Sequence, residues 1–372
     1  MKATVTIARI LTGLLFIFSG LVKAIDPRGL AYKMMEFFEA WASDGFMKNL
    51  MDALNDYALG FSIIMITLEV VVGVALLLGW QKKLTVWLLL LLMLFFTFLT
   101  SYVLFSGKIR ACGCFGDCIP LTPIQTFTKD IVLLVIALFL IFNLKYIQPL
   151  AKPMIATLYV LLATIGVLIL QGYVLKHLPV VDCLPYKKGN DILKLRQMPA
   201  DAVQDKFEYL FVYEKAGEKK EFPVTALPDS SWSFVERKQT LVAKGKNNIP
   251  LINDFSLTAE DGSDATETVL SDPASYDLFF LKELPANTAD WLDDFKKISN
   301  ASVVSLRKCY VVTAQRDVVT AFLEKNKITV SGILTCDATA IKTAARANPT
   351  LYRMKGPVVQ QKLSWADLDE LK

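Results

Sequence analysis

Long apolar runs alternate with short polar segments over the first half of the chain. Five runs are each about 20 residues long, the length that an α-helix needs to cross the ~30 Å hydrocarbon core of a bilayer. They lie at 5–24, 60–80, 84–105, 127–144 and 154–175. From Asp182 onward no run reaches that length, and charged, Gly and Pro residues are frequent. The pattern therefore predicts a membrane half followed by a water-soluble half.

The second half alternates strand-like and helix-like segments. A hairpin is predicted at 207–213 and 221–224 around the turn Lys215-Ala216-Gly217-Glu218, and a polar stretch follows at 229–248. Beyond it the pattern predicts strands at 276–281, 309–313 and 330–334, helices at 288–298, 318–324 and 338–347, a closing hairpin at 351–354 and 358–362, and a final helix at 365–371. This order is typical of an α/β domain with helices on both faces of a central sheet.

These patterns divide the chain into three parts. Residues 1–178 form a transmembrane domain, 179–248 a linker and hairpin region, and 249–372 an α/β domain. Composition agrees with this division, because 53% of the residues are hydrophobic and only 20% are charged. The net charge of +4 is spread thinly rather than gathered in a basic stripe, which excludes a nucleic-acid partner.

The positions of Lys and Arg orient the predicted spans. Segments 81–83 and 143–152 are rich in Lys, and the N-terminus carries Lys2 and Arg9. Because cytoplasmic loops carry an excess of positive charge, these segments are assigned to the cytoplasm. The loops 25–59 and 106–126, and everything after 175, then lie outside. We expect a multi-pass protein of the bacterial inner membrane with a periplasmic C-terminal domain.

The first apolar run has a second interpretation. Lys2, the run 10–22 and the small residue Ala24 also fit a secretory signal peptide. The run is long for such a peptide and contains polar groups, which favours a retained span. Cleavage would leave the downstream topology unchanged.

Four cysteines are predicted to meet at the outer membrane face. Cys112, Cys114 and Cys118 lie within seven residues of one outer loop, and Cys183 follows the last span. They fit structural disulfides, or a redox relay in which two thiol pairs exchange and a lipid-soluble quinone accepts the electrons. A third interpretation is zinc, but tetrahedral zinc sites usually use wider spacings such as C-x2-C, so no metal site is predicted.

Two acidic residues lie in or beside the predicted spans. Glu69 is near the middle of the second span, where a carboxylate is costly and needs a partner or a proton. Arg9 and Lys23 on the first span are the candidate partners. Glu69 therefore either relays protons and contacts a quinone or forms a polar clasp between helices. Asp130 either takes protons from oxidising thiols or caps the fourth span.

Several motifs of the membrane half are similar to those of known families. They are Arg9-Ile10-Leu11-Thr12-Gly13, the run 16–23, Asp26-Pro27, Glu69 with Gly73, Cys112-Gly113-Cys114-Phe115-Gly116 and Lys129-Asp130. On these motifs residues 1 to about 145 resemble the DoxX family, and the cysteine loop resembles the related MauE family of methylamine-utilisation membrane proteins. The resemblance implies a four-helix core, to which 154–175 adds a fifth transmembrane helix. It also implies a role in membrane redox processes or in maturation of periplasmic disulfide-containing enzymes.

The last third of the chain is similar to another family. The segment 255–262 resembles its opening hairpin, 317–323 the helix after its second core strand, and 346–351 the segment that holds a cis proline beside a substrate groove. On these motifs residues 249–372 resemble the thioredoxin superfamily, nearest its TlpA and redoxin branch. The resemblance implies that Pro349 is a cis proline and that Pro349 and Thr350 bind a partner.

This domain departs from the thioredoxin pattern at its cysteines. Redox-active members carry a cysteine pair after the first core strand, and the matching window 282–290 contains none. Because a thiolate is the nucleophile of this chemistry, the domain is not expected to perform thioredoxin exchange by that route. Cys309 and Cys336 stand apart and are either buried thiols or one disulfide. The domain is therefore expected to bind a partner protein.

Two functions remain open. In the first, the membrane protein supports periplasmic thiol–disulfide chemistry and acts on a periplasmic protein client or redox partner. Its catalytic residues are then Cys112, Cys114, Cys118, Cys183, Glu69 and Asp130. In the second, the protein is a non-enzymatic membrane anchor or assembly factor whose disulfides are structural.

Overall fold

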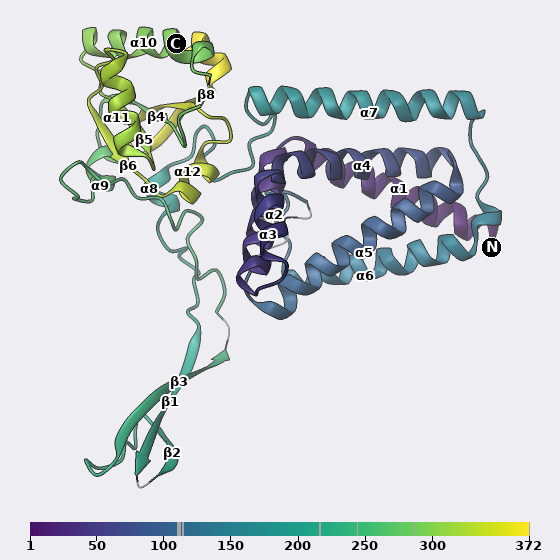
Figure 1. Ribbon diagram of the computed structural model, residues 1–372, viewed down its shortest axis with the longest axis horizontal. Coiled ribbons are helices and arrows are strands. Elements are labelled where there is room, and N and C mark those ends of the chain that lie inside the picture. Colours follow the sequence, from purple (N-terminus) through teal and green to yellow (C-terminus); the bar gives the residue numbers. More distant parts are fainter. Residues whose placement is uncertain (110–112, 114, 216, 244, 286, 372) are drawn as a thin grey trace.

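The computed structural model describes residues 1–109, 113, 115–215, 217–243, 245–285 and 287–371. A helical bundle is followed by an α/β region, from which a narrow β-sheet arm projects (Figure 1). Among the described residues, five helices are long and apolar enough to cross a membrane. They are α1 (Lys2–Ala24), α4 (Ala58–Leu78), α5 (Lys82–Ser106), α6 (Pro123–Phe142) and α7 (Pro153–Lys176). The chain is thus a multi-pass membrane protein, and its predicted spans are confirmed.

Helices α1 and α4 pack closely because glycines leave room between their backbones. A Cβ atom on Gly73 would lie 2.8 Å from the backbone oxygen of Gly13. Small residues at such contacts let membrane helices approach each other and gain van der Waals packing. Helix α7 lies against the outside of this pair, where Val167 packs with Ile66 and Val70 of α4.

Two further helices lie across the end of the bundle next to the α/β region, α2 (Pro27–Ser43) and α3 (Lys48–Asp56) (Figure 1). The sequence was interpreted there only as an outer loop, 25–59. Helix α2 begins at Pro27, and the Asp26 side chain accepts a hydrogen bond from the Gly29 amide at 3.1 Å. One face of α2 is buried against the bundle through Ala31, Met34, Phe37 and Phe38. This helical spacing is the signal that the loop interpretation passed over.

The N-terminus and the α/β region lie at opposite ends of the bundle (Figure 1). This arrangement follows from the odd number of long helices, since each crossing reverses the side on which the chain continues. The sequence predicted this separation.

The α/β region is built on a mixed five-stranded sheet in the order β6-β5-β4-β7-β8. The strands are β4 (Ser275–Phe280), β5 (Cys309–Thr313), β6 (Gly332–Thr335), β7 (Thr350–Lys355) and β8 (Val358–Ser364). Strand β5 runs parallel to β4 and β6, whereas β7 is antiparallel to β4 and β8. The predicted strands and the closing hairpin are confirmed.

Helices cover both faces of this sheet, as predicted. One core contains α8 (Ile192–Leu195), α9 (Thr266–Leu270) and α12 (Ala338–Ala344). The other core contains α10 (Ala289–Val304), α11 (Arg316–Lys325) and the 3-10 helix η2 (Trp365–Glu370). Tyr186 and Ile192 are buried in the first core, so the segment that follows α7 is part of the α/β region.

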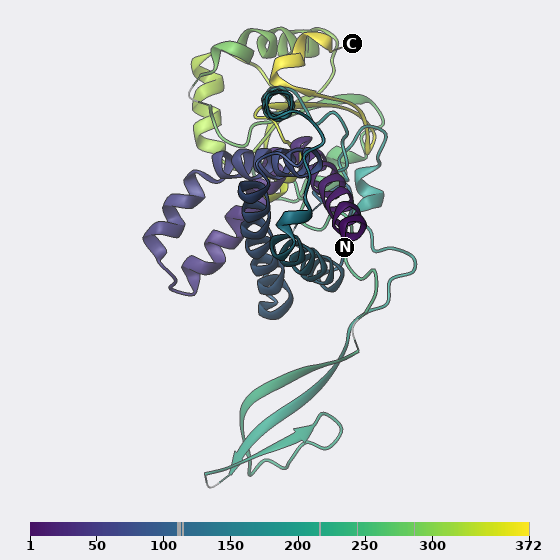
Figure 2. The same ribbon diagram turned by 90° about the vertical axis from the view of Figure 1, so that its right-hand side faces the viewer.

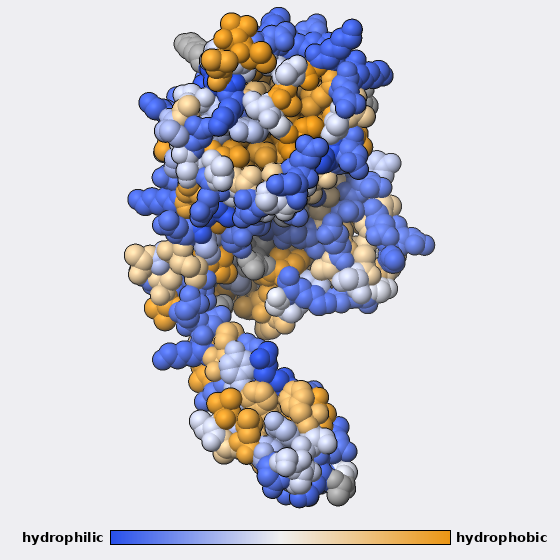
Figure 3. All heavy atoms as spheres, turned by 90° about the vertical axis from the view of Figure 1, so that its left-hand side faces the viewer, coloured by the Kyte–Doolittle hydropathy of each residue, from blue (hydrophilic) through white to orange (hydrophobic). Residues whose placement is uncertain are grey.

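The arm is a three-stranded antiparallel sheet of β1 (Lys206–Lys215), β2 (Glu218–Pro223) and β3 (Ser233–Ala243), in the order β2-β1-β3. It extends away from both the bundle and the α/β region (Figure 2). Apolar side chains gather on it (Figure 3). The predicted hairpin is confirmed, although Ala216 of its turn lies outside the described residues. Strand β3 lies in the stretch 229–248 that was interpreted only as polar, because Glu236, Arg237 and Lys238 interrupt its apolar alternation.

Candidate functional site

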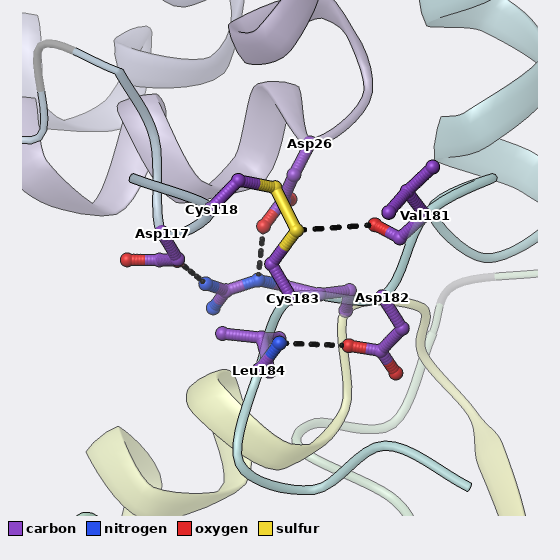
Figure 4. The surroundings of a disulfide bond; sticks show 8 residues. Asp26, Asp117, Cys118, Val181, Asp182, Cys183 and Leu184 are labelled. Atoms are coloured by element: carbon purple, nitrogen blue, oxygen red, sulfur yellow. Dashed lines mark hydrogen bonds and ion pairs between the residues drawn. A yellow bond between two sulfur atoms is a disulfide. The ribbon is translucent and has the colours of Figure 1, made fainter. Parts of the chain in front are cut away.

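A disulfide joins the membrane part to the α/β region. Cys118 lies in the loop before α6, Cys183 lies in the segment after α7, and their Cα atoms are 4.9 Å apart (Figure 4). The sequence predicted that these two residues meet at one membrane face. The other predicted members of this group, Cys112 and Cys114, lie outside the described residues.

Both disulfide cysteines follow an aspartate that is held by a cation of the α/β region. Arg346, two residues beyond the end of α12, donates from Nη2 to Asp117 Oδ2 at 2.7 Å and from Nε to Asp26 Oδ2 at 2.7 Å. Both aspartates lie beside the disulfide (Figure 4). Lys362 on β8 donates to Asp182 Oδ2 at 2.7 Å. We call these two sets of ion pairs the aspartate clasps. They connect the residues next to the disulfide to one rigid sheet domain.

The cations of the aspartate clasps are buried. Burial alone would lower the pKa of Arg346, but Asp26 and Asp117 outweigh it, so its pKa is raised. Burial lowers the pKa of Lys362, although Asp182 acts in the opposite direction. Both cations therefore depend on their carboxylate partners for compensation, because a buried charge without a partner is strongly unfavourable.

The disulfide lies in the wall of a groove of about 640 Å³ between the bundle and the α/β region. We call it the disulfide groove. Its walls come from α2, from the loop before α6, from the segment after α7 and from α12, and they include Cys118 and Cys183. Neither cysteine is fully buried. A groove of this size accommodates a peptide segment or a loop of another protein beside the disulfide.

Both predicted acidic residues line one small cavity inside the bundle. Glu69 forms an ion pair with Lys23, and Asp130 forms one with Lys129 at 2.7 Å. These four residues are called the membrane charge cluster. Phe115, one residue after Cys114 in the sequence, also lines the cavity, and Lys129 Nζ lies 5.0 Å from the centroid of its ring. The cluster is thus in contact with the described part of the loop before α6.

The structure shows which cation pairs with Glu69 and excludes one of the roles proposed for Asp130. Glu69 pairs with Lys23 rather than with Arg9, whose Nη1 donates to the Gln148 carbonyl at 2.6 Å. Asp130 does not cap its helix. Helix α6 begins at Pro123, where Thr122 and Gln125 form a capping box, and Asp130 lies farther along it with 1% exposure. The capping interpretation of Asp130 is therefore wrong.

The cavity is too small for the predicted quinone. Its volume is about 10 Å³, which is the room needed for about one water molecule. A quinone ring is several times larger, so the described residues at this position do not fit one. No electron-transfer step to a quinone is derived from this cavity.

The segment with the predicted partner-binding residues has the expected backbone. The Asn348–Pro349 peptide bond is cis, as predicted. Pro349 and Thr350 are both buried, and the Thr350 hydroxyl donates to the Ala347 carbonyl at 2.7 Å. Arg346, three residues before this proline, reaches the disulfide groove instead.

Cys309 and Cys336 are free, buried thiols, so the disulfide alternative for them is wrong. Burial raises the pKa of both thiols to about 12, from an ordinary value of 9.0. At pH 8 this reduces the thiolate fraction about a thousandfold. We expect iodoacetamide to label both residues at least that much more slowly in the folded protein than in denaturant, measured by mass spectrometry of their peptides. Comparable rates in the two states would contradict this prediction.

Sequence reasoning missed the residues of the aspartate clasps. Asp117 and Asp182 each directly precede a cysteine, and this repeated Asp-Cys pair was the available signal. Arg346 was noted only as part of a family motif. Lys362 was the last residue of a predicted strand and received no functional interpretation. Its partner Asp182 lies 180 positions away, and no local sequence pattern indicates a contact over that distance.

Comparison with known proteins supports the assignment of the membrane part. Residues 1–143 match the family model of the methylamine utilisation protein MauE, which confirms that part of the resemblance. Residues 207–244, which include most of the arm, match a domain of unknown function, DUF8463. Over 140 residues the chain is 33% identical to Protein TlpB of Flavobacterium psychrophilum. That alignment covers 37% of this chain and 36% of the relative's length. No solved structure matches the chain.

Proposed function

We propose that the protein exchanges its Cys118–Cys183 disulfide with the thiols of a periplasmic protein client and thereby supports disulfide formation in envelope proteins. The observation that carries the proposal is the position of this disulfide in the wall of the disulfide groove. An exchanging disulfide must be reached by an attacking thiolate, whereas a purely structural one needs no access. The similarity of residues 1–143 to MauE supports the same role.

The proposed exchange has two steps. A client thiolate attacks one sulfur of the disulfide, which releases the other sulfur as a thiolate and forms a mixed disulfide. A second client thiolate then attacks the client sulfur of that mixed disulfide and releases the second protein sulfur. The client loses two electrons and two protons and gains a disulfide. Cys118 and Cys183 take up both electrons and both protons and become thiols.

Regeneration is proposed to use the remaining members of the cysteine group. The Cys118 and Cys183 thiols exchange with the oxidised second pair, Cys112 and Cys114, which takes up the two electrons and the two protons. Oxidation of this second pair releases two protons, and the carboxylates of Glu69 and Asp130 are proposed to receive them. Phe115, one residue after Cys114, lines the same cavity as both acids.

The α/β region is proposed to be a thioredoxin-like domain that recruits the client on the periplasmic side. Its sheet, its cis Pro349 and its helices on both faces support this identity. Because the window 282–290 holds no cysteine, the domain supplies binding rather than thiols. Pro349 and Thr350 lie beneath the surface of this domain and support the backbone that carries Arg346 to the groove.

The exchange is tested with a reduced dithiol peptide as the probe and the purified full-length protein. We expect one peptide disulfide per protein molecule in a single turnover, with two new free thiols at Cys118 and Cys183, both measured by mass spectrometry after alkylation. The Cys118→Ser variant is expected to lose this oxidation completely, because no Cys118–Cys183 bond remains to accept the electron pair.

The matched control for this experiment is Cys336→Ser, which removes a buried thiol that does not line the groove. It is expected to oxidise the peptide as the unmodified protein does. If the unmodified protein keeps its Cys118–Cys183 bond while the peptide stays reduced, the exchange proposal fails. The disulfide is then a structural staple, the function that its position between two parts of the chain would also serve.

A further inference from the structure

The aspartate clasps place the same kind of ion pair next to each of the two disulfide cysteines. The residue before Cys118 is bound by Arg346, and the residue before Cys183 is bound by Lys362. Both cations belong to the α/β region, although the cysteines are 65 residues apart and lie on segments that leave different membrane helices. One rigid domain therefore fixes the backbone beside each sulfur.

The ion pairs of the clasps are short, and their cations are buried. The Arg346 and Lys362 side chains are only 6% and 4% exposed, and all three of their bonds to carboxylates are 2.7 Å long. The carboxylates are more open, 20% exposed for Asp26 and Asp182 and 40% for Asp117. Because each cation is itself shielded from water, these charge-assisted bonds are stronger than ordinary surface ion pairs and fix geometry. Arg346 also holds Asp26, which caps α2, so the guanidinium joins α2, the cysteine loop and α12.

We infer that Arg346 and Lys362 are positioning residues of the disulfide: by holding Asp117 and Asp182 from one domain, they keep the two sulfurs together and favour the disulfide over the dithiol. The inference rests on the proposed function in taking this bond as the reactive one. Because linkage is reciprocal, the disulfide must stabilise the clasps as much as the clasps stabilise the disulfide. Reduction therefore weakens the ion pairs of the clasps by the same free energy.

The inference is tested by the equilibrium of the Cys118–Cys183 bond with glutathione buffers of defined ratio, using the full-length protein and mass spectrometry of alkylated peptides. In Asp117→Asn, Arg346 keeps Asp26 as a partner, so no unpaired buried charge is created. We expect the equilibrium of this variant to shift about tenfold toward the dithiol, which equals about 30 mV. Lys362→Met is expected to shift it in the same direction, and Arg346→Lys less than Arg346→Gln.

The matched control is Lys342→Met. Lys342 lies on α12, lines the same groove and contacts the same Tyr32 ring as Arg346, but it forms no ion pair among the described residues. Its replacement is expected to leave the equilibrium unchanged. If Lys362→Met does not fold, the double variant Asp182→Asn/Lys362→Met, which removes both charges, replaces it.

The outcomes separate this inference from the proposed function. Equal equilibrium constants in Asp117→Asn, in the Lys362 single or double variant and in the unmodified protein overturn the inference, whatever happens to the dithiol peptide. Shifted constants together with a peptide that stays reduced support the positioning role and reject the exchange function. A shift of the same size in Lys342→Met also overturns the inference, because it assigns the effect to general charge in the groove.

Discussion

Glu69→Gln is expected to destabilise the membrane part by about 3–5 kcal/mol, since removing one partner of a buried ion pair leaves the other charge uncompensated. Lys23 is 3% exposed, and besides Glu69 it contacts the Ser19 hydroxyl at 3.1 Å and the Phe96 ring at 5.0 Å. Neither carries an opposite charge. The measurement is the free energy of unfolding of the purified protein, from a denaturant titration in detergent followed by circular dichroism.

The control is the double variant Lys23→Met/Glu69→Leu, which replaces the pair by apolar side chains of similar size. Such replacements are often neutral or stabilising, so the double variant is expected to regain most of the lost stability. Its single-turnover oxidation of the dithiol peptide is expected to be unchanged, because that step uses only Cys118 and Cys183. An unchanged stability in Glu69→Gln alone would contradict the prediction.

Gly73→Ala has the second large expected effect, a loss of about 1–3 kcal/mol, the usual cost of overpacking. The added Cβ would lie 2.8 Å from the Gly13 carbonyl oxygen and 2.9 Å from the Ile17 backbone nitrogen. Both are backbone atoms of α1, so neither can rotate away and the helix itself must shift. The same titration measures the loss.

Gly60→Ala is the matched control on the same helix. A Cβ at Gly60 would meet no atom within 4 Å, and alanine favours helix over glycine by up to about 1 kcal/mol. This variant is therefore expected to be as stable as the unmodified protein or more stable. Equal losses in the two variants would show that the close approach of α1 and α4 does not depend on Gly73.

Features that depend on local pattern were predictable from the sequence. The long helices follow from the length of each apolar run, and strands such as β5 and β7 follow from short buried runs between turn residues. Elements in which charged residues interrupt the pattern of apolar positions were missed. Helix α2 carries four charged residues among its 17, which make its apolar spacing harder to recognise. Strand β3 is exposed along its whole length, so it has no buried face to produce an alternation.

The chemistry of the site was only partly predictable, because it depends on contacts between distant residues. The topology brought Cys118 and Cys183 to one face but left their pairing open. It also left Glu69 with two candidate partners. In the antiparallel pair α1 and α4, Lys23 reaches the depth of Glu69, whereas Arg9 lies about 21 Å farther along α1 at 1.5 Å per residue. The aspartate clasps needed the docked α/β region, which no local pattern specifies.

The bond between Cys118 and Cys183 also makes a covalent ring from the chain segment that contains α6 and α7. This ring passes through the bilayer twice. It cannot close until α7 has carried residue 183 to the side where residue 118 already lies. A chain in which α7 failed to insert would keep the Cys118 and Cys183 thiols on opposite sides of the membrane. The Cys118–Cys183 bond can therefore form only in a molecule in which α7 has already crossed the membrane.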